Sequence, residues 1–345
     1  MHKLYVSTDG NGATNHVVLF DFCKAFDLIN HHILLEKLLT YDIPGQVVCW
    51  ILDFLTFRRQ RTKHAIDCSS EWHYVPAGVP QGTKLGPWLF LIMVNDLEIM
   101  GMDVWKFVDD LTMSEVVQKG LPSHIQEAVD SLSRQPFLHD LQLNVIKCKE
   151  LRICFGKTSP TLDPVKVNGR SFVVSSGKNL GLNVSNDLKW NVHIAALVKK
   201  ASSPLFSLKQ LKRSAVAPSE LILFYVTCIR SILDYACPVF HRALPSYLSD
   251  DLERQKRAMK VIYPLLSYTA ALKESGLSTL HERREVISLK TFAGIKEDKS
   301  HKLHELLPKN TTGRYSIRNN RPFNLPKCKT ERCRSTFIIS HIFSQ

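Results

Sequence analysis

The sequence predicts an α+β fold, in which an antiparallel sheet packs on helices and a basic helical domain follows. Short apolar runs rich in β-formers alternate with helix-period segments in the first part of the chain. Beyond about residue 188, helix-period segments dominate and strand patterns are rare. Basic residues also concentrate in the later part. We therefore expect a mixed domain over 1–187, a helical domain over 188–310 and a basic, irregular tail over 311–345.

The first elements are defined by apolar runs and by the residues that stop them. Residues 17–20 (VVLF) predict a buried strand. A helix over about 31–40 can be capped by Asp27 or Asn30, and a proline–glycine pair then separates it from a helix over about 45–57. Strands are expected over 104–108 and 111–116, joined by a tight turn.

Similar reasoning predicts the remaining elements. They are a hairpin over 63–79, a helix over about 87–100, a helix opened by Pro122 and ended or kinked by Pro136, strands over 148–155 and 163–184 with a turn at Asn168-Gly169, and helices over roughly 191–213, 218–236, 246–263 and 278–296.

Charge divides the chain unevenly. Residues 1–150 hold 13 Lys and Arg against 18 Asp and Glu, whereas the remainder holds 32 against 14. A basic region of this size is expected for a protein with a polyanionic partner, although solvated lysine-rich helix faces explain the same charge. The motifs therefore have to decide between these readings.

Sequence composition indicates the cellular compartment of the protein. No uninterrupted apolar run is long enough to predict a membrane span, and the N-terminus lacks the layout of a signal peptide. The nine scattered cysteines suit a reduced compartment, so we expect a nuclear or cytoplasmic protein that is not secreted. Cys328 and Cys333 are the one suggestive pair, and no second pair beside them completes a zinc site.

Three carboxylates stand where strands end. Asp21 follows the apolar run 17–20, where an unpaired charge is costly unless a cation compensates it. Asp109 and Asp110 are adjacent between strand-forming residues, and their mutual repulsion is relieved by a divalent ion. An Asp-Asp pair alone is more often an ordinary hairpin turn. Proximity of Asp21 to this pair would favour a metal site.

The segment 78–87 (GVPQGTKLGP) is rich in glycine and proline directly before a predicted helix. Such a loop exposes backbone N–H groups at a helix N-terminus, which suits a phosphate or the edge of a nucleotide. A purely structural loop is the equally weighted alternative.

Together these segments resemble the successive palm motifs of reverse transcriptases, and most closely those of non-LTR (LINE-type) retrotransposons. The matching segments are 21–27 (DFCKAFD), 78–87 and 107–110 (FVDD). The resemblance continues through 143–148 (LNVIKC), through 180–184 (LGLNV), which is similar to the primer-grip region, and through the thumb-like segments 190–213 and 233–239. It implies the palm of a right-hand polymerase, followed by a helical thumb.

The resemblance also implies a mechanism and its residues. Two Mg²⁺ ions would be bound by Asp21, Asp109 and Asp110, and nucleotidyl transfer would follow from this two-metal clamp. Lys147 would protonate the leaving pyrophosphate, although an exposed lysine at a strand start is an equal alternative. The nucleotide pocket would be lined by three residues, namely Phe26, Gln81 and Gly82. Phe26 would exclude a ribose 2′-hydroxyl, unless it is simply a core residue.

The implied function is RNA-directed DNA polymerisation, with an RNA template, a DNA primer and deoxynucleoside triphosphates as partners. Basic helices beyond residue 190 would hold the duplex, among them one that carries Arg254, Lys256, Arg257 and Lys260. Family members have a substantial fingers region before the first aspartate, and here only 20 residues precede Asp21. The alternative is therefore a non-catalytic remnant that retains only nucleic-acid binding.

Overall fold

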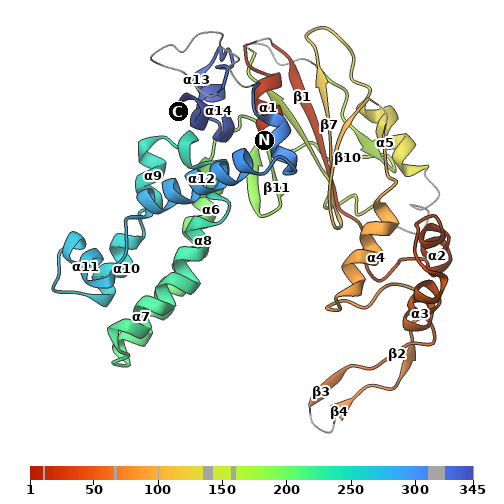
Figure 1. Ribbon diagram of the computed structural model, residues 1–345, viewed down its shortest axis with the longest axis horizontal. Coiled ribbons are helices and arrows are strands. Elements are labelled where there is room, and N and C mark those ends of the chain that lie inside the picture. The colour runs from red at the N-terminus through yellow and green to blue at the C-terminus, as the bar shows by residue number, and fades with distance from the viewer. Residues whose placement is uncertain are drawn as a thin grey trace. The chain divides into compact units, whose positions relative to one another are not determined.

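The computed structural model describes residues 1–10, 12–65, 68–99, 101–134, 143–156, 161–309 and 323–344. The chain divides into two compact units (Figure 1). The sheet unit comprises Thr14–Arg152 and Pro160–Leu180. The helical unit comprises Met1–Ala13, Ile153–Ser159 and Gly181–Gln345.

The sheet unit contains a four-stranded sheet and four helices within the described residues, together with short hairpins. Its elements in chain order are β1 (Thr14–Phe20), α2 (His31–Leu39), α3 (Gly45–Leu55), β2 (Arg59–Gln60), β3 (Lys63–Ala65), β4 (Cys68–Ser69), β5 (His73–Tyr74), α4 (Leu85–Val94), β6 (Asp103–Phe107), β7 (Asp110–Val117), α5 (Ile125–Ser133), β8 (Lys149–Cys154), β9 (Lys166–Val167), β10 (Arg170–Ser171) and β11 (Ser176–Asn179).

The strand order of the main sheet is β6-β7-β1-β8, with β7 antiparallel to both β6 and β1. All seven residues of β1 are buried, as expected for a central strand covered on both faces. On one face, Val18 and Phe20 of β1 pack with α2, α4 and α5 in the core of the unit. On the other face, a Cβ at Gly177 of β11 would lie 2.8 Å from Leu19 Cδ1, so a larger residue there would displace the end of the Leu19 side chain.

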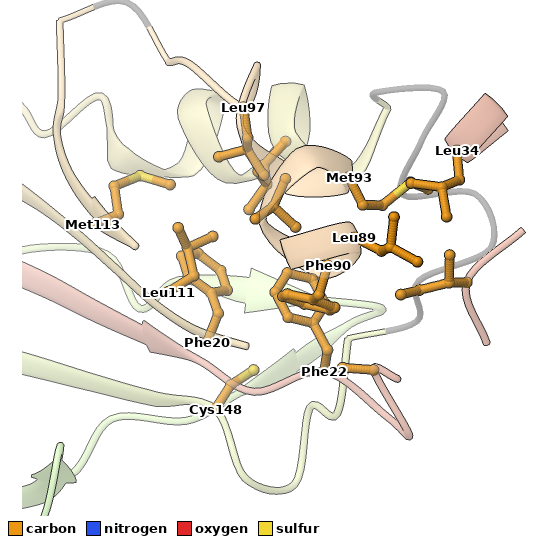
Figure 2. Packing of buried hydrophobic residues seen from close by; sticks show 14 of the residues in the cluster. Phe20, Phe22, Leu34, Leu89, Phe90, Met93, Leu97, Leu111, Met113 and Cys148 are labelled. Carbon is orange, nitrogen blue, oxygen red and sulfur yellow. The ribbon is translucent and has the colours of Figure 1, made fainter. Parts of the chain in front are cut away.

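Figure 2 shows the core where the sheet meets α4. Leu89, Phe90 and Met93 of α4 are fully buried and lie between the sheet and Leu34 of α2. Each such side chain contributes about 1.5–3 kcal/mol through burial. Phe20 and Leu111 are part of the same core, so the ends of β1 and β7 are held firmly where the candidate carboxylates follow.

The helix predicted over 87–100 begins at Leu85 and ends at Val94, earlier than expected. Two lysine ammonium groups bind the carbonyls at its C-terminal end. Lys37 Nζ donates to Met93 O at 2.6 Å, and Lys106 Nζ donates to Asn95 O at 2.7 Å. Cations at this position complement the helix dipole, and the chain leaves the helix there. Helix α5 ends at Ser133, and Pro136 lies outside the described residues.

The helical unit is built from helices with one short strand. Its elements are α1 (His2–Ser7), β12 (Leu182–Ser185), α6 (Asn191–Arg213), α7 (Pro218–Phe224), the π-helix η2 (Tyr225–Arg230), α8 (Ser231–Asp234), the 3₁₀ helices η3 (Cys237–Val239) and η4 (His241–Ala243), α9 (Ser246–Leu252), α10 (Gln255–Ile262), α11 (Tyr268–Ser275), α12 (Leu280–Glu297), the 3₁₀ helix η5 (Lys302–Leu306), α13 (Glu331–Arg334) and α14 (Phe337–Phe343).

Several predictions for this unit need correction. The helix predicted over 218–236 is interrupted by η2, and the one over 246–263 divides into α9 and α10. The segment Pro218–Val239 is long and apolar enough in composition to cross a membrane; 28% of its most apolar stretch is buried, including Tyr225 and Ile229 in the core of the unit. The tail over 311–345 was expected to be irregular, yet its described residues, 323–344, include α13 and α14, and Ile338 and Ile342 pack against Phe292 of α12.

The predicted α+β class is confirmed by the mixture of helices and antiparallel strands. The predicted division at residues 187 and 188 stays a prediction. By its contacts, the chain changes from the sheet unit to the helical unit between Leu180 and Gly181.

Candidate active site

The ends of two neighbouring strands bring Asp21 and Asp110 together. In the β1–β7 register Phe20 pairs with Leu111. Asp21 directly follows Phe20 and Asp110 directly precedes Leu111, so the two aspartates lie at the same end of this strand pair. Asp110 is the first residue of β7 and pairs with Phe107 of β6. Val108 and Asp109 therefore form a two-residue hairpin turn beside the end of β1. The two predicted strands are confirmed, whereas the turn, expected at Asp109-Asp110, lies one residue earlier and Asp110 belongs to β7.

The hairpin turn has a strained backbone. Val108 has φ = 53°, in the left-handed region that β-branched residues rarely occupy. This conformation costs about 1–2 kcal/mol, and the β6–β7 ladder on both sides holds it in place. Strain of this kind is typical of functional sites, and here it fixes the backbone that carries Asp109.

The three carboxylates interact electrostatically. Partial burial raises the pKa of Asp110, and the charges of Asp109 and Asp21 raise it further. One carboxylate oxygen, Asp21 Oδ1, is buried and has no hydrogen-bond partner in the described structure. Lys147 Nζ lies 3.4 Å from this oxygen, close enough for an ion pair but without hydrogen-bond geometry. The predicted residues Asp21, Asp109, Asp110 and Lys147 therefore gather at one end of the sheet.

A turn in the segment 143–148 holds the backbone of Asp21. Asn144 N donates to Asp21 O at 2.7 Å, and Phe22 forms an antiparallel bridge with Leu143. Lys147 N then donates to Asn144 O at 2.9 Å, which closes the turn that directs Lys147 toward Asp21. Sequence reasoning cited this segment for its resemblance alone. The structure shows that its backbone positions both groups.

The donor set fits a hard divalent cation. Carboxylate oxygens are the ligands that Mg²⁺ prefers, and the buried Asp21 Oδ1 has no hydrogen bond, so its coordination by a cation would displace none. Within the described ranges, however, no three His, Cys, Asp or Glu side chains already converge as metal ligands. The carboxylates share one region, and their side chains would need to turn inward to bind a cation together.

The residues predicted to line a nucleotide pocket lie on two adjacent segments. Phe26 stacks on Phe90 of α4, with ring centroids 5.0 Å apart and planes inclined by 15°. Gln81 Nε2 donates to Asp27 Oδ1 at 3.1 Å, which links the glycine-rich loop to the segment after Asp21. Gly82 has φ = 79°, and a Cβ there would meet no atom within 4 Å, so open space lies above its backbone.

A pocket of about 640 Å³ lies beside this loop. Lys24, Arg58 and Gln81 line it together with Asp27 and Tyr74. Gln81 is therefore on a cavity wall, as a nucleotide-lining residue should be. None of the residues that line the pocket is one of the four catalytic candidates, although Lys24 and Asp27 follow Asp21 closely in the chain.

Sequence reasoning missed the residues that hold the glycine-rich loop. The carbonyl of Gly78 accepts hydrogen bonds from Arg58 Nη2 at 2.6 Å and from His31 Nε2 at 2.8 Å. Gly78 itself has φ = 79°, and a Cβ there would lie 2.5 Å from Asp27 O. Burial lowers the pKa of the Arg58 guanidinium. Nothing local distinguishes Arg58 from the neighbouring Arg59, because its role depends on a contact 20 residues away.

The predicted basic helix is largely confirmed as an exposed surface. Lys256, Arg257 and Lys260 are exposed on α10, whereas Arg254 is half-buried at its N-terminal end. The opposite side of α10 buries Ala258 and Met259 in the core of the helical unit. This helix therefore presents cations on one side only.

Comparison with known proteins identifies the family. Residues 5–184 match the family model described as reverse transcriptase (RNA-dependent DNA polymerase). The matched region contains both strand ends, the glycine-rich loop and the segment that holds Asp21. The chain is also similar to several retrotransposon proteins of Drosophila. The resemblance to non-LTR enzymes is confirmed by these relatives.

The RNA-directed DNA polymerase from the mobile element jockey of Drosophila melanogaster is 26% identical over 246 residues, which are 66% of this chain and 26% of the relative. The probable RNA-directed DNA polymerase from transposon BS of the same species is 25% identical over 295 residues, which are 80% of this chain and 32% of the relative. The chain thus spans between a quarter and a third of the length of these relatives.

Among solved structures, the telomerase of Candida tropicalis in complex with a TWJ fragment of telomeric RNA is similar at 13% identity, with a TM-score of 0.41. The likeness covers 86% of this chain and 49% of the telomerase chain. The family generally uses divalent metal ions, in agreement with the oxygen donors at the strand ends. Because the family model matches more than half of its residues, this chain belongs to the reverse transcriptase (RNA-dependent DNA polymerase) family.

Proposed function

We propose that the chain is the polymerase region of a LINE-type retrotransposon enzyme that extends a DNA primer with deoxynucleoside triphosphates on an RNA template. The observation that carries the proposal is the β1–β7 register, which places Asp21 beside Asp109 and Asp110 within the region that matches the family. Burial raises the pKa of Asp110 most, and the charges of Asp109 and Asp21 raise it further, which is consistent with three neighbouring carboxylates.

We assign Asp21, Asp109 and Asp110 to two Mg²⁺ ions. When bound, such ions favour ionisation of the primer 3′-hydroxyl and stabilise charge on the leaving pyrophosphate. The contribution of the chain is to hold the carboxylates in place. Asn144 fixes the backbone at Asp21, and the strained turn at Val108 fixes the backbone at Asp109. The Lys147 ammonium, 3.4 Å from Asp21 Oδ1, is the proposed proton donor to pyrophosphate.

Phe26 is the proposed sugar gate. Its ring stacks on the buried ring of Phe90, so it cannot swing away without losing this contact. A rigid ring beneath the sugar would clash with a 2′-hydroxyl. Gln81 and Gly82 are proposed to contact the nucleotide, one from the wall of the pocket and the other through its open backbone. We expect Phe26→Ala to incorporate ribonucleotides, whereas Phe26→Tyr keeps the discrimination.

The proposed partners of the helical unit are the phosphates of the template–primer duplex, contacted in part by Lys256, Arg257 and Lys260. These cations are exposed, so they can bind phosphate without the cost of desolvating a buried charge. The duplex affinity of a variant that lacks all three should be weaker and should depend less steeply on salt.

Primer extension tests the function. The purified chain is given a DNA primer on an RNA template, deoxynucleotides and Mg²⁺, beside the variants Asp109→Asn and Asp53→Asn. Asp53 is exposed on α3 and controls for loss of a surface charge in the same unit. We expect product from the wild type and Asp53→Asn, and none from Asp109→Asn. Equal background from all three, with duplex binding intact, would instead identify a non-catalytic remnant.

A further inference from the structure

A two-stranded arm extends from the helices of the sheet unit. Its strands β2 and β5 pair antiparallel, β3 and β4 continue it, and Figure 1 shows the arm projecting beyond α2 and α3. The sequence predicts a hairpin over 63–79, and the observed arm begins earlier, at Arg59. None of the described residues of β2, β4 and β5 is buried, so packing in the core does not account for the choice of side chains in the arm.

The arm carries two arginine–aromatic pairs. The guanidinium of Arg59 lies 4.4 Å from the ring centroid of Tyr74, its cross-strand partner. The guanidinium of Arg61 lies 4.7 Å from the ring centroid of Trp72. Arg61 directly follows β2 and Trp72 directly precedes β5, so the second pair lies next to the first along the arm. We name Arg59, Arg61, Trp72 and Tyr74 the arm face.

The arm face is exposed and positively charged. Trp72 is 57% exposed and Tyr74 is 66% exposed, which is unusual for large aromatic side chains. In the part of the chain that the structure describes, no carboxylate forms an ion pair with Arg59 or Arg61. Residues 58–74 hold four Lys and Arg against two Asp and Glu, within a half of the chain that is otherwise acidic.

We propose that the arm face binds unpaired bases of single-stranded RNA, and that in the working enzyme this strand is the template. Aromatic rings offer a stacking surface to any base, and adjacent cations contact the backbone phosphates. Two neighbouring stacking positions suit an extended strand. A base-paired duplex buries the faces of its bases, so it cannot use the arm face. The identity of the strand as template rests on the proposed function, whereas the binding chemistry does not.

Binding of fluorescently labelled oligouridylate by the full chain, in buffer with a chelator and no nucleotide, tests the proposal. Each stacking ring contributes about 1–3 kcal/mol, so Trp72→Ala should weaken binding about 5- to 150-fold. Trp72→Phe should retain most of the affinity and Trp72→Leu should lose it, because only the former keeps a ring. The matched control is Trp50→Ala, which removes a 60% exposed tryptophan from α3 and should change nothing.

Salt dependence separates stacking from charge. Trp72→Ala should leave the slope of log K against log salt unchanged, whereas Arg61→Gln should reduce its magnitude by about 0.7. Binding of a blunt RNA duplex should be the same in all variants. The proposal is overturned if Trp72→Ala binds oligouridylate like the wild type, or if it loses duplex and single-strand affinity equally.

The proposed function can fail independently. If the chain binds oligouridylate through Trp72 but extends no primer, the arm face is a binding site for single-stranded RNA, and the proposal that this RNA is a template is wrong. If the wild type extends primers but Trp72→Ala binds oligouridylate as tightly as the wild type, the proposed function stands and the proposal for the arm face is wrong.

Discussion

Replacing Gly78 with alanine should destabilise the sheet unit more than the same replacement at Gly82. Both glycines have φ = 79°, so both substitutions incur the cost of a left-handed alanine, about 1–2 kcal/mol. They differ in the space around the new Cβ. At Gly82 no atom lies within 4 Å, whereas at Gly78 the carbonyl oxygen of Asp27 lies at 2.5 Å and its carbon at 2.7 Å.

The backbone at Gly78 cannot shift freely to relieve this clash. Its carbonyl accepts from Arg58 and His31, and its N–H donates to Ile29 O at 2.8 Å. Overpacking against a fixed neighbour typically costs about 1–3 kcal/mol more. We therefore expect Gly82→Ala to lower the free energy of unfolding by about 1–2 kcal/mol and Gly78→Ala by about 2–5 kcal/mol.

Urea unfolding at constant m-value measures both variants. Gly101→Ala is a further control, because Gly101 also has φ = 79° and open space around its Cβ. Equal destabilisation by all three substitutions would refute the reasoning, since it would mean that the contact between the loop and Asp27 imposes no steric cost. A nucleotide KM raised by Gly78→Ala would show in addition that this contact positions Gln81.

Three further outcomes follow from individual side chains. Because burial and its acidic neighbours raise the pKa of Asp110, its contribution to stability is lost as pH rises through that pKa; Asp110→Asn should thus gain stability over wild type from acid to neutral pH in unfolding titrations. The hydrogen bonds of Glu150, including one of 2.7 Å to His16, outweigh the effect of its burial and lower the pKa of its carboxyl group. The stability that Glu150 contributes is lost as pH falls through that pKa, so Glu150→Ala should lower the free energy of unfolding by roughly 3–5 kcal/mol at neutral pH and by little in acid, as measured in the same titrations. Thr279 forms a capping box with Glu282, and Thr279→Ala should lower the free energy of unfolding of the helical unit by about 0.5–2 kcal/mol, whereas Thr291→Ala, in mid-helix, serves as control.

Elements set by local pattern could be predicted from the sequence. The apolar run before Asp21 predicted β1, and strand-like residues on both sides predicted a turn at 109–110, one residue later than the observed turn at 108–109. The sequence predicted Asp27 or Asn30 as the cap of α2. In the structure Asn30 is the cap, because its side chain accepts a hydrogen bond from His32 N at 2.9 Å. In each case the deciding interaction lies within a few residues.

Features set by distant contacts could not be predicted. Helix α14 has no strong pattern of its own and depends on Phe292, about 45 residues earlier in the chain. The π-helical turn at Tyr225–Arg230 accompanies burial of its tyrosine and isoleucine in the core. The role of Arg58 in holding the glycine-rich loop likewise follows only from the fold. The sequence predicted the chemical groups of the candidate site, and long-range packing determined which residues support them.

Divalent-metal binding to variants of Asp21 and Asp110 tests the central claim most directly, namely that the ends of β1 and β7 form one metal centre. Mn²⁺ affinity is measured for the wild type, Asp21→Asn, Asp110→Asn and the double variant. Ligands of a shared site are coupled, so the double variant should lose clearly less affinity than the two single losses combined. Additive losses, or Mn²⁺ binding that neither substitution weakens, would contradict the account.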